Sequence, residues 1–392
     1  MKKKIAIIGS TGSIGISLLS ILNDEKKNIE ILLLTANKSY GLLLKQAKKF
    51  KVKNLIITDK KSFKKANKTN KNLKLKIFND INSFNKIFSK KVDYTMSSIT
   101  GIDGLEPTIK IIKHSKKIAI ANKESIICGW SLIKKELKKN STKFVPVDSE
   151  HFSLWYGLKN KNTNSLEKIY LTASGGPLYK INNNKMDKVT VKQALKHPNW
   201  KMGKKISIDS ATLINKVYEV VEAKNIFDIS YKNIEILIHP KSYVHALIKF
   251  NNGLIKIIAH ETTMRIPIFN TLFTNEDKKF ATKQINIKIL NNLDFKRVDA
   301  KKFPMVNLIK YLPKKNSLYE TVIVSANDIL VELFLKNKIK FTDIQKNLFK
   351  LIKSNEFIKY KKIYPKKIND IIKLNNYVRL KILKKVYKSL VI

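Results

Sequence analysis

Short apolar runs alternate with amphipathic stretches through the first 150 residues. Apolar runs at residues 4–8, 29–34, 55–57, 94–99 and 118–121 have the length of buried strands, and helical patterns separate them. This alternation predicts a parallel, doubly wound α/β sheet. Binding crevices in such sheets lie beyond the carboxyl ends of the strands, so polar residues that directly follow a strand are the first candidates for chemistry.

The pattern changes from about residue 151. Apolar runs at 171–173, 234–238, 243–250 and 254–258 indicate strands, and Asn251-Asn252-Gly253 is a strong hairpin turn between the last two. A helix is expected to start near Asp209, Ser210 or Thr212. Residues 275–300 are polar and lysine-rich, and helical patterns follow at 318–335, at 342–352 behind a capping-box pattern, and at 377–390.

We therefore predict four segments. Residues 1–150 form a Rossmann-like domain, and residues 151–274 form an α+β connective and catalytic domain. Residues 275–300 form a linker, and residues 301–392 form a C-terminal helical domain. The length of 392 residues is ample for several buried cores.

A glycine-rich turn follows the first strand. Gly9, Gly12 and Gly15 have the spacing G-x-x-G-x-x-G and open onto an amphipathic helix. Strand, glycine turn and helix are the parts of a dinucleotide-binding unit, in which the pyrophosphate lies on the helix N-terminus. The spacing differs from the usual G-x-G-x-x-G, so a purely structural turn is the alternative.

The end of the second strand bears on cofactor choice. An enzyme that selects NAD places an acidic residue there for the ribose 2′-hydroxyl, but this chain has Asn37, Lys38 and Ser39. These residues suit a 2′-phosphate, which predicts NADP. The alternative is that Lys38 is one more surface lysine.

Two carboxylates follow a further apolar run, in Val147-Asp148-Ser149-Glu150. On an extended backbone, residues i and i+2 point to the same side, so Asp148 and Glu150 would converge and favour a divalent cation. An acidic loop end is the alternative. Asn122-Lys123-Glu124-Ser125 follows a neighbouring strand, and we expect the two stretches to face one pocket.

The second half adds polar groups and a loop. Ser174-Gly175-Gly176-Pro177 is a flexible turn, and the loop from His197 to Gly203 carries Trp200 and Met202, which is typical of a lid over a ligand. A Trp that merely pins the loop is the alternative. On the helix beyond residue 209, Asn215 and Glu219 lie one turn apart, and Glu219 offers a third carboxylate unless it faces solvent.

Charge and cysteine content limit the remaining possibilities. The formal net charge is +48, but the excess is scattered lysine, and Arg occurs only at Arg265, Arg297 and Arg379. Because specific nucleic-acid recognition favours Arg, we expect no specific nucleic-acid partner. Cys128 is the only cysteine, so no internal disulfide is possible, and we expect a cytoplasmic protein. We also expect neither a signal peptide nor a membrane span.

Taken in order, these motifs resemble the 1-deoxy-D-xylulose 5-phosphate reductoisomerase family over essentially the whole chain. The motifs are Gly9 to Gly15, Asn122 to Ser125, Val147 to His151, Ser174 to Pro177, His197 to Trp200, and Asp209 to Thr212 with Asn215, Lys216 and Glu219. The resemblance implies an NADPH-dependent oxidoreductase of the methylerythritol phosphate (MEP) pathway to isoprenoids. It also implies a homodimer that pairs through the hairpin sheet.

The resemblance assigns roles to individual residues. Asp148, Glu150 and Glu219 would bind Mg²⁺ or Mn²⁺, with Co²⁺ as a further candidate, and together with Lys123 would form the catalytic group. Substrate would be bound by those carboxylates and by Lys123, Ser149, Ser174, His197, Trp200, Ser210, Asn215 and Lys216. NADPH would contact Gly9, Ser10, Thr11, Gly12, Ser13, Ile14, Ala36, Asn37, Lys38, Ser39, Asn122, Glu124, Met202 and Gly203.

The implied reaction rearranges the carbon skeleton of 1-deoxy-D-xylulose 5-phosphate by a retro-aldol and aldol sequence and then reduces the aldehyde to 2-C-methyl-D-erythritol 4-phosphate. The residues are equally compatible with a direct α-ketol shift. The alternative function is a plain NADP-dependent sugar-phosphate dehydrogenase without rearrangement. Three places depart from the family pattern: Val217-Tyr218, Ala259 to Arg265, and Asp328 in place of Glu.

Overall fold

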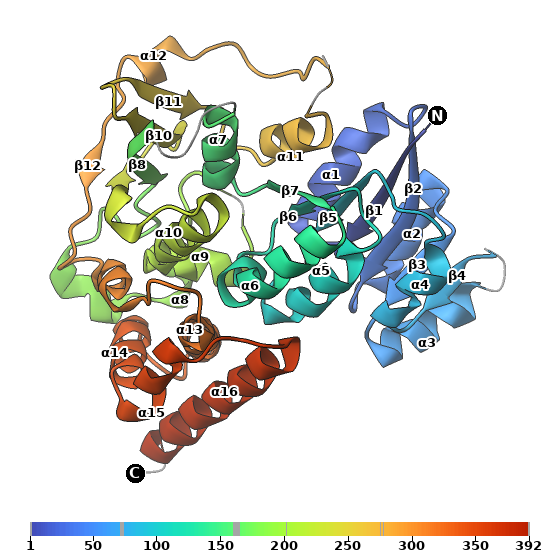
Figure 1. The fold of residues 1–392 in the computed structure, drawn as a ribbon. Coiled ribbons are helices and arrows are strands. Elements are labelled where there is room, and N and C mark those ends of the chain that lie inside the picture. Colours follow the sequence, from blue (N-terminus) through green and yellow to red (C-terminus); the bar gives the residue numbers. More distant parts are fainter. Residues whose placement is uncertain are drawn as a thin grey trace. The chain divides into compact units, whose positions relative to one another are not determined.

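The chain divides into two compact units, each described below by itself. The computed structural model describes residues 2–70, 74–159, 165–200, 202–274, 276 and 278–390. Unit 1 consists of Met1–Ser125, Ser131–Phe152 and Met264–Ala281, and unit 2 of Ile126–Trp130, Ser153–Thr263 and Thr282–Ile392 (Figure 1). Among the described helices, none has the length and apolar content needed to cross a membrane.

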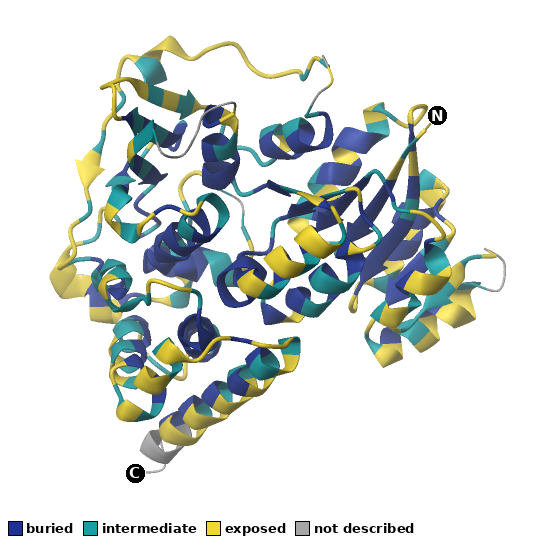
Figure 2. Ribbon diagram, in the orientation of Figure 1, coloured by how far each residue is buried: buried dark blue, intermediate teal, exposed yellow. Residues whose placement is uncertain are grey.

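Unit 1 is built on a seven-stranded sheet in which all neighbouring strands are parallel. The strand order is β4-β3-β2-β1-β5-β6-β7. The strands are β1 (Lys3–Ile8), β2 (Ile29–Ala36), β3 (Asn54–Ile57), β4 (Lys76–Phe78), β5 (Tyr94–Ser97), β6 (Lys117–Ile120) and β7 (Lys143–Pro146). The predicted doubly wound parallel sheet is confirmed, and its central strands are apolar and buried because helices cover both faces (Figure 2).

The helices that follow these strands in sequence are α1 (Ser13–Asp24), α2 (Tyr40–Phe50), α3 (Lys60–Thr69), α4 (Phe84–Ile87), α5 (Leu105–Ile112), α6 (Lys123–Lys139) and α7 (Ser149–Gly157). β1 pairs with β2 on one side and with β5 on the other, so the strand order reverses beside β1. The turn at Gly9 follows β1 at this reversal, which is where parallel sheets open a crevice for ligands.

A later segment returns to unit 1. Residues 264–281 carry α11 (Arg265–Leu272), which packs on α1. The hydroxyl groups of Tyr94 and Thr271 lie 3.1 Å apart in the buried interior of this unit. Nothing in the local pattern of residues 264–281 indicates this attachment, because it depends on contacts with residues more than 170 positions earlier.

Unit 2 contains a five-stranded mixed sheet in the order β11-β10-β8-β9-β12. Its strands are β8 (Leu166–Ala173), β9 (Ile234–Ile238), β10 (Val244–Phe250), β11 (Ile255–Ala259) and β12 (Lys296–Arg297). β8 and β9 are parallel, and the other neighbours are antiparallel. β10 and β11 form the hairpin that the turn at Asn251 to Gly253 predicts.

Helices make up the rest of unit 2. They are α8 (Val191–Ala194), α9 (Lys204–Ala211), α10 (Ile214–Phe227), α12 (Ile287–Leu290), α13 (Leu318–Leu335), α14 (Phe341–Ile352), α15 (Asn355–Ile358) and α16 (Ile368–Leu390). α13 is buried on nearly all sides, with α14 and α16 packed against it (Figure 2). β12 and α12 lie in the segment predicted as a linker, of which Asn275 and Asp277 are outside the described residues.

Two predicted helix starts are wrong. Asp209 and Ser210 lie inside α9, and Thr212 is its C-terminal cap, because Leu213 adopts a left-handed conformation (φ +59°) that separates α9 from α10. In α14, Thr342 is the second helical residue. The carboxylate of Asp343 accepts the backbone N–H of Lys340 at 2.9 Å, so the N-terminal cap is Lys340, two residues before the Thr342 that the capping-box pattern predicts.

Candidate active site

The turn after β1 is shaped by close packing. Gly9 has φ +88°, and a Cβ there would lie 3.0 Å from the carbonyl carbon of Ser98. The Gly9 N–H donates to Thr35 Oγ1 at 2.8 Å, and Ser10 Oγ donates to Gln46 Oε1 at 2.8 Å. Because Gly12 is the N-terminal cap of α1, the turn presents the start of a helix at the strand-order reversal, which favours an anionic ligand.

The segment after β2 is held by its neighbours while Asn37, Lys38 and Ser39 are exposed to solvent. Asn37 Nδ2 donates to Thr58 Oγ1 at 2.8 Å, and the Lys38 carbonyl accepts from Ser62 Oγ at 3.2 Å. The side chains of Lys38 and Ser39 are exposed. This arrangement fixes the backbone and leaves a flexible cation beside the predicted cofactor crevice.

Asn122 caps α6 and ties two strand ends together. Its side-chain oxygen accepts from Ser125 N at 2.5 Å, and its amide donates to the carbonyls of Ile99 and of Gly101, the latter at 2.8 Å. Glu124 lies buried in the first turn of the same helix. The Asn122 amide therefore ties the segment after β5 to the start of α6.

The carboxylates of Asp148 and Glu150 do converge, but not by the predicted route. β7 ends at Pro146 and α7 begins at Ser149, so Glu150 lies in the first turn of a helix and the premise of an extended backbone is wrong. Carboxylate oxygens of the two residues nevertheless lie within 4.8 Å of each other. Ser149 Oγ donates to Glu150 Oε2 at 2.6 Å and orients that side chain.

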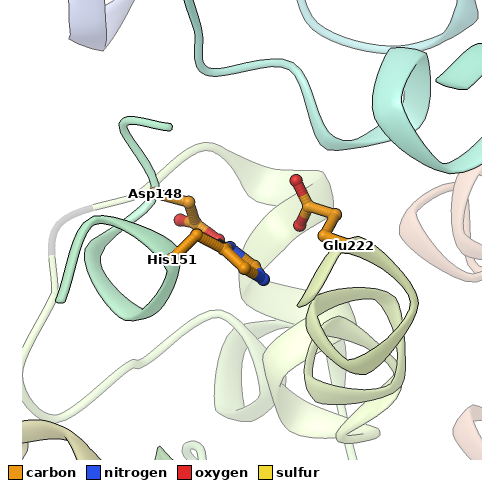
Figure 3. A group of neighbouring side chains, drawn as sticks. All are labelled: Asp148, His151 and Glu222. Atoms are coloured by element: carbon orange, nitrogen blue, oxygen red, sulfur yellow. Dashed lines mark ion pairs between the residues drawn. The ribbon is translucent and has the colours of Figure 1, made fainter. Parts of the chain in front are cut away.

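Two cations or potential cations contact Asp148. Lys123, the first residue of α6, forms an ion pair with it, and His151 Nδ1 lies 3.4 Å from its Oδ2 (Figure 3). Burial raises the pKa of Asp148, but the charge of Lys123 and the hydrogen bond from His151 outweigh it, and the pKa falls below its ordinary range. Asp148 is thus a stable carboxylate. Glu222, the third residue drawn, belongs to α10 of unit 2.

In unit 2, the start of α10 brings an amide, an ammonium group and a carboxylate together. Asn215 Nδ2 donates to Glu219 Oε1 at 2.5 Å, and Lys216 Nζ lies 2.5 Å from Glu219 Oε2. Glu219 is buried, so the predicted alternative of a solvent-facing Glu219 is wrong. The positive charge of Lys216, one turn earlier in the same helix, balances the negative charge of Glu219.

The side chains of His197 and Ser174 are in contact within unit 2. His197 Nδ1 accepts the backbone N–H of Asn199 at 3.2 Å and of Trp200 at 3.0 Å, while Nε2 lies 3.2 Å from Ser174 Oγ. Because Nδ1 accepts, Nε2 carries the hydrogen and donates to Ser174. Burial and the charge of Lys216 lower the pKa of His197 to about 4, so the ring is neutral at pH 7.

Ser174 also lies close to Ser210. Its Oγ accepts the Gly176 N–H at 3.1 Å, and a Cβ added to Gly176 would lie 2.5 Å from the Ser210 carbonyl oxygen. Gly175 and Gly176 both have positive φ, which lets the turn pack closely against α9. Ser174 thus contacts His197, its turn packs against Ser210, and the charge of Lys216 acts on His197; the single anion site remains a prediction.

The loop between α8 and α9 is anchored. Asn199 Nδ2 donates to the Pro240 carbonyl at 2.6 Å and to Ser242 Oγ at 2.8 Å. The Trp200 ring packs edge-on against His245, whose ring stacks on His260 at 3.8 Å. Met202 is half-buried, and Gly203 caps α9.

Sequence reasoning gave no role to two residues that the structure places beside site residues. His151 is fully buried against Asp148, and Asn199 holds the Trp200 loop. The position of His151 three residues after Asp148, at the start of a helix, is the signal that would have indicated the contact. The contacts of Asn199 lie more than 40 residues away and leave no local signal.

Three family models match most of this chain. A family model described as 1-deoxy-D-xylulose 5-phosphate reductoisomerase matches residues 5–129, that of its C-terminal domain matches residues 144–227, and a model described as the DXP reductoisomerase C-terminal domain matches residues 260–381.

Relatives of the same name match nearly the whole chain. The 1-deoxy-D-xylulose 5-phosphate reductoisomerase of Pelagibacter ubique is 58% identical over 97% of this chain and 98% of its own length, and that of Clostridium tetani is 39% identical over 88% and 90%. A solved reductoisomerase in complex with NADPH, fosmidomycin and magnesium superposes with a TM-score of 0.91 at 28% identity, covering 98% of both chains. The Zymomonas mobilis enzyme in complex with NADPH gives 0.87 at 29% identity, covering 98% of this chain and 99% of its own. The chain therefore belongs to the 1-deoxy-D-xylulose 5-phosphate reductoisomerase family.

Proposed function

We infer that this chain converts 1-deoxy-D-xylulose 5-phosphate to 2-C-methyl-D-erythritol 4-phosphate in the MEP pathway, with NADPH and a divalent metal ion as cofactors. The observation that carries this inference is the 58% identity to a reductoisomerase over nearly the whole of both chains. The plain dehydrogenase is not favoured, because it explains neither this match nor the paired carboxylates.

We propose that Asp148, Glu150 and Glu219 are the residues that bind the metal ion, as the family resemblance implies. Three carboxylates are a hard oxygen donor set, which fits Mg²⁺ or Mn²⁺, with Co²⁺ as a further candidate. The converging oxygens of Asp148 and Glu150 and the low pKa of Asp148 support the proposal.

The phosphate of the substrate is assigned to unit 2. Ser174, Ser210, Asn215 and Lys216 form the proposed phosphate clamp, and His197 completes it. Ser174 Oγ already accepts hydrogen bonds from His197 and from Gly176 N–H, so its own hydroxyl hydrogen remains available to donate to an anion. Lys216 contributes positive charge beside it.

NADPH is assigned to the crevice beyond β1. The glycine turn from Gly9 to Ile14 would bind the pyrophosphate, and the segment from Ala36 to Ser39 would bind the 2′-phosphate. Asn122, Glu124, Met202 and Gly203 would line the remaining contacts. The exposed cation of Lys38 at the end of β2 supports the choice of NADPH over NADH.

The residues of the chain then have defined tasks. A bound divalent ion supplies Lewis acidity to the ketone and hydroxyl oxygens of the substrate, and NADPH supplies hydride. Lys123 and Ser149, which contact Asp148 and Glu150 respectively, orient the substrate oxygens. The loop with Trp200 covers the substrate and excludes water, which protects the reactive aldehyde.

A coupled assay tests this function. NADPH oxidation is followed with 1-deoxy-D-xylulose 5-phosphate, and the carbon skeleton of the product is determined by NMR. A branched product formed only with metal present is the expected result. A linear product would leave the dehydrogenase as the better description, and turnover unchanged in excess EDTA would remove the metal assignment.

We also propose a homodimer that pairs through β11. This edge strand exposes Ile255 and Ile257, and Leu254 just before it is exposed as well; an exposed apolar edge is a template for pairing with a second strand. Ile257→Lys should shift the sedimentation coefficient from dimer to monomer, whereas Ile287→Lys, at an equally exposed apolar residue elsewhere in unit 2, should not. A wild-type chain that sediments as a monomer at micromolar concentration would contradict the proposal.

Two further assignments stay proposals. The functional division is residues 1–150 for NADPH binding, 151–274 for catalysis and pairing, 275–300 for a linker and 301–392 for a helical domain. We place the protein in the cytoplasm, supported by the lone buried Cys128 and by its use of NADPH. Cell fractionation tests the location.

A further inference from the structure

A buried carboxylate next to the phosphate clamp is held from a distant helix. Asp209 lies in the last turn of α9, and Asn327 of α13 donates its amide to Asp209 Oδ1 at 2.7 Å. Lys205, one turn earlier in α9, lies 2.9 Å from Asp209 Oδ2 and 3.0 Å from Asp328 Oδ1. Both oxygens of Asp209 therefore have a donor.

The Asp209–Asn327 hydrogen bond is buried. Asp209 and Asn327 are both buried, and the side chain of Asp209 is 3% exposed. A buried carboxylate is tolerated only while its hydrogen-bond donors are in place, so loss of one donor forces the helix end to move or admits water.

Asp209 is adjacent to Ser210, which belongs to the proposed clamp. Ser210 is locked by its backbone, since its carbonyl accepts from Leu213 N at 3.1 Å and leaves no room for a Cβ at Gly176. Thr212 Oγ1 donates to the Asp209 carbonyl at 3.2 Å in the same turn. A shift of Asp209 would therefore be passed directly to Ser210 and to the turn that carries Ser174.

We propose that Asn327 and Asp209 are positioning residues, through which helix α13 sets the affinity of the clamp for the substrate phosphate. Neither side chain is aimed at the substrate in this assignment: Asp209 points to α13, 118 residues further along the chain. The inference rests on the proposed phosphate clamp. A merely stabilising contact is the competing explanation, and it would lower stability without a selective effect on phosphate.

The test measures inhibition by inorganic phosphate, KM for 1-deoxy-D-xylulose 5-phosphate, the Kd of NADPH and the thermal midpoint in the full-length enzyme. Asn327→Leu keeps the branching at Cγ and removes the donor to Asp209. We expect phosphate inhibition to weaken and KM to rise by about tenfold each, with the Kd of NADPH unchanged. Asn347→Leu, which removes an amide bonded to the Asp343 carbonyl on α14, is the matched control and should leave both phosphate readouts unchanged.

A second variant guards against misfolding of the first. Asn327→Asp places a second carboxylate against Asp209, and this variant should bind phosphate poorly. The double variant Asp209→Asn with Asn327→Asp exchanges the two side chains and restores one donor and one acceptor to the contact. We expect the exchange to recover phosphate affinity to within about threefold of wild type. An exchange as poor as Asn327→Asp alone would overturn the proposal.

Ser210→Ala separates this inference from the clamp on which it rests. If Ser210→Ala leaves phosphate inhibition unchanged, the clamp itself is wrong. If Ser210→Ala weakens inhibition but Asn327→Leu alters only the thermal midpoint, the clamp stands and the positioning role of Asn327 is overturned.

Discussion

Lys216 Nζ and Glu219 Oε2 lie 2.5 Å apart on adjacent turns of α10, so a proposed phosphate ligand and a proposed metal ligand share one ion pair. Asn215 contacts the same carboxylate at 2.5 Å. On the proposed assignment, the substrate phosphate would bind Lys216 and the metal ion would bind Glu219. Binding of both ligands would therefore replace this ion pair.

The first prediction concerns Glu219. Glu219→Gln keeps an oxygen that can accept from Asn215 but removes the negative charge. We expect kcat to fall by at least about 100-fold, while the Kd of NADPH stays the same. Steady-state kinetics and fluorescence titration of NADPH measure the two effects. Near-normal turnover would exclude Glu219 from the metal site.

The second prediction concerns metal removal. Excess EDTA should abolish NADPH oxidation, and Mg²⁺ or Mn²⁺ should restore it, because the proposed donor set consists of carboxylates. Circular dichroism before and after chelation should be identical, since Asp148 is paired with Lys123 and His151 without metal. A chain that unfolds in EDTA would indicate a structural metal instead.

The third prediction concerns Lys38 and cofactor choice. Lys38→Ala should raise KM for NADPH by about tenfold and leave KM for NADH unchanged, because a lysine contact to the 2′-phosphate is a charge-assisted hydrogen bond. Lys134→Ala, at an exposed lysine on α6, is the control. Equal effects on both cofactors would show that Lys38 does not read the 2′-phosphate.

The fourth prediction concerns the protonation of His197. Its folded pKa of about 4 lies below the ordinary 6.5, so the unfolded chain binds the proton more readily between these values. The stability that His197 contributes is present above pH 6.5 and is lost as the pH falls toward 4. Nitrogen-15 NMR should show a neutral ring with the hydrogen on Nε2 at pH 7. A ring that titrates near pH 6.5 would contradict the hydrogen bonds at Nδ1.

The fifth prediction concerns Glu320, a buried carboxylate in the first turn of α13. Burial raises its pKa to about 7, even though its carboxylate accepts from Ser317 N and Oγ. The folded state holds the proton more tightly than the unfolded state. The contribution of Glu320 to the free energy of unfolding is therefore largest below pH 4.5 and decreases as the pH rises through 7, by about 3 kcal/mol in total.

Glu320→Gln should remove that pH dependence. Gln keeps an acceptor for Ser317 and carries no charge, so the variant should be more stable than wild type at pH 9 and similar at pH 5. Urea denaturation at the two pH values measures the difference. Parallel pH profiles for variant and wild type would show that Glu320 ionises freely.

Local sequence determined the elements and the chemistry of this protein. The strand, glycine turn and helix at residues 3–24, the hairpin at Asn251 to Gly253 and the carboxylates at Asp148 and Glu150 could be predicted, because each depends on neighbours in the chain. The helical rather than extended backbone at Glu150 was not predicted, since the apolar run before it did not show that β7 ends at Pro146 and α7 begins at Ser149.

The tertiary structure alone decided which distant groups meet. The pairs Ser174 with His197 and Asp209 with Asn327 are separated by 23 and 118 residues, and the attachment of α11 to unit 1 spans more than 170. No periodicity encodes such contacts, because they follow from the packing of whole helices and sheets. The sequence therefore determined which elements form and which polar residues are candidates for chemistry, and the fold decided which of those residues lie in contact.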